Sequence, residues 1–186
     1  VVYDEVAEVT FFNDPYGTLR IEKKSDTGMN LPGAVIKIEH IESGQTWTAT
    51  TTSAGVAIFD QIPLGAYRIQ EITAPAGWKL DDTVYTATVV AGETTTIPII
   101  NEELPGLRII KYDRKNMVAM PNVTFAVYRD GKFLGNFKTD QFGEILLTNV
   151  EPGTYRAFEV DTGDEGHILD TTPQEVELHA GDGIKE

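Results

Sequence analysis

Three polar residues, Lys23, Glu71 and Asn101, occupy positions at which strand alternation would turn them toward a protein core. Each is preceded, two and four positions earlier, by apolar residues. These are Leu19 and Ile21, Tyr67 and Ile69, and Ile97 and Ile99. Because successive side chains of a β-strand point to opposite faces, residues two apart share a face. An amine, a carboxylic acid and a carboxamide are therefore expected to meet in an apolar interior.

The amine and the carboxamide can form an amide bond, and the acid can assist the reaction. Burial lowers the pKa of a lysine amine, so that part of it is neutral and nucleophilic. Burial raises the pKa of a glutamic acid, which can then donate a hydrogen bond to the carboxamide. Attack of Lys23 on Asn101, assisted by Glu71, would release ammonia, and a dry core can supply an effective molarity on the order of 10⁵ M. The reaction occurs once per molecule, so we expect self-processing and not an enzyme with turnover.

The lysine and the glutamate recur further along the chain. Lys111 and Glu159 follow Lys23 and Glu71 at one offset, 88 residues (111 − 23 and 159 − 71). The segment LRIEK, which ends at Lys23, is repeated as LRIIK, which ends at Lys111. A recurrence of this kind indicates tandem copies of one structural unit. We expect a complete repeat at residues 18–102 and a second repeat at residues 107–186 that lacks its final strand.

The two ends of the chain are expected to be out of phase with these repeats. Asn13 precedes Leu19 by the same six residues by which Asn101 precedes Leu107. Residues 1–13 are therefore interpreted as the last strand of a preceding repeat, with Asn13 as its acceptor remnant. The second repeat's own asparagine is expected beyond the last residue of this sequence. We expect no second bond within this chain, unless Asn13 of a neighbouring molecule supplies the missing strand.

The chain reads as β-strand throughout. Short runs rich in β-branched residues alternate with turns of Gly, Pro, Asn and Asp, and no segment sustains a helical period. In the first repeat the expected strands are 19–23, 34–40, 46–52, 56–59, 67–72, 84–90 and 95–100. Regular short strands of this kind indicate an all-β fold with one β-sandwich per repeat.

Composition excludes several classes of function. The net charge is −14, from 29 acidic and 15 basic residues, which argues against nucleic acid as a partner. No apolar run is long enough to cross a bilayer, so we expect no membrane insertion of this fragment. Cysteine is absent, which indicates either the cytosol or a covalent staple other than a disulfide. The sequence opens as if in the middle of a protein, and we interpret it as a fragment.

Other candidate sites are weaker. Trp47, Trp78 and the tyrosines could form a carbohydrate platform, although core packing is the favoured interpretation. Four acidic residues could bind calcium but lack the spacing of a calcium loop, so a solvated loop is favoured. They are Asp161, Asp164, Glu165 and Asp170. The three histidines are too scattered to predict a metal site or a catalytic triad. We expect no metal and no cofactor.

An ordered set of motifs resembles a known family. The motifs are the opening LRIEK, the turns at 31–34 and 52–55, the segment 64–67, the stretch YRIQEITAPAGW at 67–78, and the terminal Asn101. Together they resemble the collagen-adhesin B-type (SpaA-like, prealbumin-like) repeat domains of Gram-positive surface proteins and pilins. The resemblance implies tandem Ig-like or prealbumin-like β-sandwich domains. It also implies a self-generated isopeptide bond between Lys23 and Asn101, with Glu71 catalytic.

The resemblance implies a structural stalk in an extracellular, cell wall-anchored adhesin or pilin, whose partners are neighbouring repeats of the same protein. Two alternatives stay open: a module that binds host extracellular matrix or glycan, and an accessory domain of a secreted enzyme. The second repeat departs from the pattern, because residues 161–166 replace the Ala-Pro-Ala-Gly turn. We therefore expect Lys111 and Glu159 to form an incomplete site, without an acceptor asparagine.

Overall fold

A computed structural model describes residues 9–11 and 15–186, and this part of the chain contains strands and no helix. No helix that could span a membrane is found among these residues. The strands are β1 (Gly17–Ser25), β2 (Val35–His40), β3 (Thr46–Thr50), β4 (Val56–Ile62), β5 (Gly65–Thr73), β6 (Tyr85–Val89), β7 (Thr94–Asn101), β8 (Gly106–Ile110), β9 (Thr124–Arg129), β10 (Lys132–Lys138), β11 (Glu144–Leu147), β12 (Gly153–Asp161), β13 (Gln174–Leu178) and β14 (Ile184–Lys185). The predicted all-β fold class is confirmed. Asn13 lies outside the described residues.

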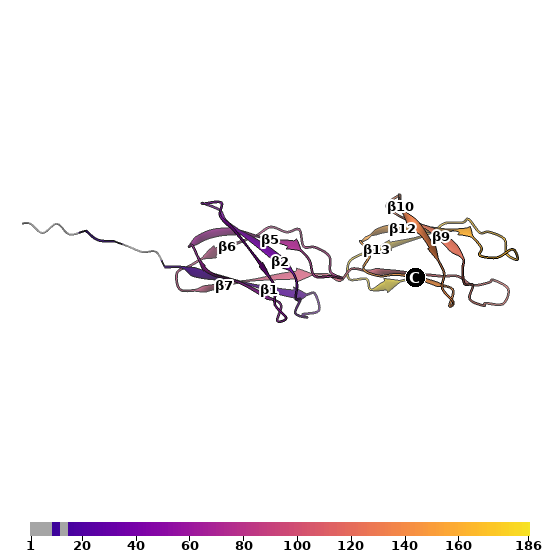
Figure 1. The fold of residues 1–186 in the computed structure, drawn as a ribbon, viewed down its shortest axis with the longest axis horizontal. Coiled ribbons are helices and arrows are strands. Elements are labelled where there is room, and N and C mark those ends of the chain that lie inside the picture. The colour runs from indigo at the N-terminus through magenta and orange to yellow at the C-terminus, as the bar shows by residue number, and fades with distance from the viewer. Residues whose placement is uncertain (1–8, 12–14) are drawn as a thin grey trace, which may run out of the picture. The chain divides into compact units, whose positions relative to one another are not determined.

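The strands form two β-sandwiches, each built from two sheets (Figure 1). In the first sandwich a sheet with the order β4-β1-β7 faces a sheet with the order β3-β2-β5-β6. In the second, β11-β8-β14 faces β10-β9-β12-β13. The chain divides into two compact units, Val1–Ala74 with Asp81–Ile100 and Pro75–Leu80 with Asn101–Glu186, and each is described by itself.

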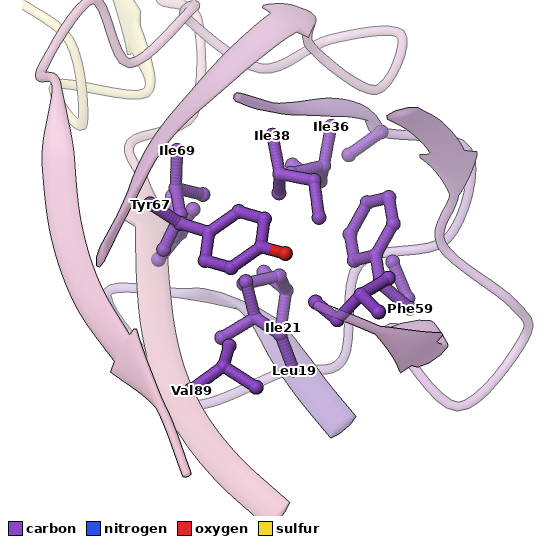
Figure 2. Packing of buried hydrophobic residues seen from close by; sticks show 12 residues of the cluster. Leu19, Ile21, Ile36, Ile38, Phe59, Tyr67, Ile69 and Val89 are labelled. Carbon is purple, nitrogen blue, oxygen red and sulfur yellow. The ribbon is translucent and has the colours of Figure 1, made fainter. Parts of the chain in front are cut away.

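The core of the first sandwich follows from the alternation of its strands. Along β1, every second residue from Gly17 to Ser25 is buried, and the residues between them are partly exposed. The inward residues of β1, β2, β4 and β5 interdigitate around the ring of Tyr67 (Figure 2). The buried cluster comprises Leu19, Ile21, Ala34, Ile36, Ile38, Ala57, Phe59, Ile62, Tyr67, Ile69, Val89 and Ile99. Full burial of each large apolar side chain contributes about 1.5–3 kcal/mol, which fixes the register of each strand.

The second sandwich repeats this plan with a smaller buried cluster: Leu107, Val127, Tyr155 and Leu178. In both sandwiches the central tyrosine hydroxyl donates to a backbone carbonyl four residues earlier, at 2.8 Å: Tyr67 to Pro63 and Tyr155 to Glu151. Such a partner satisfies the one polar atom of an otherwise buried ring. The two repeats therefore share internal hydrogen bonds as well as sequence.

Trp47, one of the two tryptophans considered for a carbohydrate platform, lies on β3. It is partly buried against the first core, with its ring centroid 5.9 Å from that of Tyr67. A ring packed in this way contributes area to the core and offers little free face to a ligand.

Candidate functional site

Strands β1 and β5 bring Lys23 and Glu71 together inside the first sandwich. Nζ of Lys23 lies 3.4 Å from Oε1 of Glu71, and both side chains are fully buried. The two strands belong to opposite sheets, so the pair spans the interior between them. A buried lysine and glutamate can exist as an ion pair in close contact. They can also exist as a neutral amine and a neutral acid, after a proton passes from the lysine to the glutamate.

Burial sets the protonation of the amine. Removal from water lowers the pKa of Lys23 below its ordinary value of 10.5, although the nearby charges of Glu71 and Asp81 act in the opposite direction. Desolvation is the largest of these effects, so burial shifts the amine toward its neutral form. A neutral amine carries the lone pair that a nucleophile requires.

A second acid, Asp81, orients Glu71. Its backbone N–H donates to Oε2 of Glu71 at 2.9 Å. Its carboxylate accepts hydrogen bonds from the hydroxyl of Tyr85 at 2.7 Å and from the backbone N–H of Thr83 at 3.0 Å. Burial would raise the pKa of Asp81, but these hydrogen bonds and the charge of Lys23 outweigh it, so the pKa is lowered. Burial and the hydrogen bond to Asp81 raise the pKa of Tyr85 to about 12.

Sequence reasoning missed both Asp81 and Tyr85. Tyr85 could have been found, because it is in phase with Ala87 and the buried Val89 on β6. Asp81 lies before β6 in a segment without regular structure, where no alternation reveals which side chains point inward.

Asn101 is the last residue of β7 and is 2% exposed. Strand β7 is hydrogen-bonded to β1, the strand that carries Lys23. The buried Ile99 precedes Asn101 on the same face, as alternation predicts.

The turn at 74–78 fixes the segment that follows Asn101. The backbone N–H of Lys79 donates to the carbonyl of Glu102, and that of Leu104 donates to the carbonyl of Gly77, both at 2.9 Å. Trp78 forms an isolated bridge with Glu103 between these two bonds. The Ala-Pro-Ala-Gly-Trp stretch therefore holds the end of β7 in place.

A glycine holds the backbone of Lys23. The N–H of Lys23 donates to the carbonyl of Gly55 at 2.7 Å, and the carbonyl of Lys23 accepts from Leu31 at 2.9 Å. Gly55 has a φ of 70°, and a Cβ there would lie 2.5 Å from the carbonyl oxygen of Lys23. No other residue type fits this conformation and this contact without strain.

Lys111 and Glu159 meet in the second sandwich in more open surroundings. Nζ of Lys111 lies 3.0 Å from Oε2 of Glu159, and the side chains are 23% and 2% exposed. Asp170 donates its backbone N–H to the same Oε2 at 3.3 Å. Among the described residues, Oε1 of Glu159 has no hydrogen-bond partner although it is buried. Both side chains of the pair line a groove of about 520 Å³ beside β8.

The family model of the SpaA prealbumin-like fold domain matches the chain twice, over residues 17–103 and 105–186. The chain belongs to this SpaA family. No match is found among curated proteins.

Solved structures share this fold. The Bacillus anthracis TIE protein is 30% identical with a TM-score of 0.50, over 92% of this chain and 33% of that one. A streptococcal ancillary pilin is 17% identical with a TM-score of 0.53, over 91% of this chain and 61% of that one. The shaft pilin SpaA of Lactobacillus rhamnosus GG is 13% identical with a TM-score of 0.56, over 91% and 95%. The chain thus spans about a third of the first protein and less than two thirds of the second.

The two SpaA repeats hold their lysine backbones in the same way. In the second repeat, Lys111 donates to the carbonyl of Gly143 at 2.9 Å and accepts from Met120 at 2.9 Å. A Cβ on Gly143 would lie 2.7 Å from the carbonyl oxygen of Lys111. The two repeats of this chain therefore place the lysine backbone through equivalent contacts.

The acidic loop of the second SpaA repeat is tied to a histidine. Nδ1 of His167 lies 2.9 Å from both carboxylate oxygens of Asp164, and Nε2 lies 3.9 Å from Asp113. The hydrogen bond to Asp164 raises the pKa of His167. Within the described part of the chain, no group of three or more His, Cys, Asp or Glu residues is arranged to hold a metal.

Proposed function

We propose that the chain is part of a structural stalk on a Gram-positive cell surface, whose first SpaA repeat is closed by an amide bond between Lys23 and Asn101. The observation that carries this proposal is the fully buried pair of Lys23 and Glu71, with Nζ and Oε1 3.4 Å apart. The buried position of Asn101 at the end of the neighbouring strand β7 adds to it.

The reaction begins with a proton transfer within the pair. Lys23 gives a proton to Glu71, which yields a neutral amine and a neutral acid, the forms that an apolar interior favours. Nζ then attacks Cγ of Asn101 while the acid of Glu71 donates to Oδ1. This donation stabilises the negative charge that develops on the oxygen.

Collapse of the tetrahedral intermediate releases one ammonia. Glu71 accepts the proton that Nζ loses and delivers a proton to Nδ2, so that the leaving group departs as neutral ammonia. A C–N bond forms between Lys23 and Asn101, the C–N bond of the carboxamide breaks, and Glu71 is left as the neutral acid, with the proton that it first took from Lys23. Because water is excluded from the core, it does not compete with Lys23 for attack on the carboxamide.

The bond would close a loop of 78 residue steps (101 − 23). By the chain-entropy relation used for disulfides, such a loop stabilises the folded state by about 4–5 kcal/mol. Tension applied along β1 would pass to β7 through the amide, so the strands between them would not have to bear it. This role suits a stalk in a chain without cysteine.

The second repeat is proposed to form no bond of its own within this chain. Residues 150–186 include no asparagine, so none of them can serve Lys111 as an acceptor. Lys111 and Glu159 act as a partly exposed ion pair, unless a strand from a neighbouring molecule supplies an acceptor such as Asn13.

Intact mass tests the bond directly. The chain is expected to weigh less than its sequence by one ammonia, and the Lys23→Ala, Asn101→Ala and Glu71→Ala variants are expected to show the full mass. Peptide mapping should recover a branched peptide that joins β1 to β7. Lys111→Ala is the matched control and should keep the loss of one ammonia. A parent chain of unmodified mass would remove the covalent mechanism.

A further inference from the structure

Three aromatic residues gather on the outer face of one sheet of the second sandwich, and we name Tyr128, Phe133 and Phe158 the aromatic platform. Tyr128 and Phe158 are stacked, with ring centroids 5.8 Å apart and planes 18° from parallel. Phe133 lies 5.2 Å from Tyr128 at a tilt of 54° and is 51% exposed.

Strand alternation places this platform away from the core. On β12, Tyr155 and Glu159 are buried inside the sandwich, so Phe158 belongs to the opposite face. On β9, Val127 packs in the second core, so Tyr128 also points outward. The platform is therefore independent of the lysine–glutamate pair.

The first repeat has polar residues at all three corresponding positions. Tyr128 pairs with Arg156 as Glu39 pairs with Arg68, and these arginines are 88 residues apart (156 − 68). By the same registers Gln70 corresponds to Phe158 and Thr46 to Phe133.

The first sandwich thus builds the same sheet with Glu39, Gln70 and Thr46 on its outer face. Because this fold does not require aromatic residues there, packing alone does not account for them in the second. Tyr128 and Phe158 are partly exposed and Phe133 is exposed. A cluster of apolar side chains that stays in reach of solvent on one of two matched surfaces is typical of a binding site.

A hollow of about 680 Å³ adjoins the platform, and Tyr128 and Phe158 line it together with a polar rim. The rim carries Asp130, Thr154, Arg156 and Glu175. Each carboxylate lies near a guanidinium: Glu175 is 3.7 Å from Arg156, and Asp130 is 3.8 Å from Arg129. The lining itself carries two carboxylates and one guanidinium, and Arg129 beside it brings the local charge close to balance in a chain whose net charge is −14.

We propose that the aromatic platform binds a neutral carbohydrate. The C–H face of a sugar ring can pack on the faces of Tyr128 and Phe158, which carry a partial negative charge. Sugar hydroxyls donate and accept hydrogen bonds, and the rim offers acceptors in Asp130 and Glu175 and a donor in Arg156. A cationic or anionic partner would gain little, because the charges of the rim offset one another.

The test uses the full chain and neutral oligosaccharides built of glucose, galactose, mannose and N-acetylglucosamine, with binding read by saturation-transfer NMR. At least one of these probes is expected to bind. Tyr128→Glu and Phe158→Gln, which install the residues of the first repeat, should each weaken that binding at least tenfold. Phe142→Ala, at an aromatic residue that is 63% exposed outside the platform, is the control and should bind as the parent does.

The unfolding midpoint of the second sandwich, measured for every variant, separates a lost ligand contact from a lost fold. Failure of all the oligosaccharides to bind would overturn the proposal. So would binding that persists in both platform variants, or a platform that mediates self-association in sedimentation experiments instead. None of these outcomes changes the mass of the chain, so failure here is distinct from failure of the amide bond between Lys23 and Asn101.

Discussion

In the first sandwich the lysine–glutamate pair is sealed from solvent, whereas in the second the same pair borders an open groove. The side chains of Lys23 and Glu71 are 0% exposed, and that of Lys111 is 23% exposed. Both lysines are held by the same glycine contact, so the difference does not arise from β1 or β8. It arises from what surrounds the pair.

The surroundings of the two glutamates differ in one further contact. Asp81 and Asp170 both donate a backbone N–H to their glutamate. Asp81 also accepts from Tyr85, but the residue four positions after Asp170 is Gln174, which is exposed. The proposed chemistry needs the pair of Lys23 and Glu71. It also needs the acceptor Asn101 on β7 and a carboxylate, Asp81, that Tyr85 holds in place beside Glu71.

The largest expected effect is a difference in stability between substitutions of the two lysines. Lys23→Met should cost about 4–5 kcal/mol more unfolding free energy than Lys111→Met, because only the first substitution removes a covalent loop. Both substitutions leave a buried glutamate without its amine, so that cost largely cancels. Guanidinium unfolding followed by hydrogen exchange in each repeat measures the difference. Lys24→Met, on the opposite face of β1, is the control, and equal losses at Lys23 and Lys111 would contradict the covalent loop.

The second prediction concerns what the repeats share. Gly55→Ala and Gly143→Ala should destabilise their own sandwiches by similar amounts, about 1–3 kcal/mol each, because both force a Cβ against a lysine carbonyl at a positive φ. Gly55→Ala should also slow the loss of ammonia, since it displaces Lys23. Unfolding curves and the time course of intact mass measure both effects. An unchanged stability in either variant would show that the backbone adjusts freely.

The third prediction tests the protonation of the first pair in an Asn101→Ala variant, in which the amine of Lys23 cannot react. Burial lowers the pKa of Lys23 in the folded state below the 10.5 of the unfolded chain, so the unfolded chain binds more protons between these two values. Stability should therefore rise with pH up to about 10.5, by at most about 1.4 kcal/mol per pH unit. The reference is the double variant Lys23→Met/Asn101→Ala, which corrects for other groups. A difference that is flat or falls with pH would contradict a lowered pKa.

The smallest expected effect concerns Tyr85, which is hydrogen-bonded to Asp81 in the first repeat and has no counterpart in the second. Tyr85→Phe removes the hydroxyl that donates to Asp81 and should cost about 1 kcal/mol. It should also slow amide formation without preventing it. Gln174→Ala, at the corresponding exposed position, should change stability by less than about 0.5 kcal/mol. Chemical unfolding and timed mass measurements distinguish the two, and equal effects would mean that Tyr85 does not support the site.

Local geometry made much of this protein predictable from its residues. Alternation with a period of two is a property of any strand, so it was enough to predict that Lys23, Glu71 and Lys111 turn toward the core of their sandwich. The repeated spacing then located Glu159, and the ordered motifs led to the family and to a β-sandwich in each repeat. The proposed bond to Asn101 stays a prediction, and Asn13 lies outside the described residues.

Features that depend on several strands at once came only from the folded chain. The contact of Asp81 with Glu71 joins a segment without periodicity to a strand ten residues away. The aromatic platform requires the registers of β9, β10 and β12 together, including the irregularity between Phe133 and Gly135. Alternation assigns a face to each residue, but only the packing of the sheets decides which side chains on that face come within reach of one another.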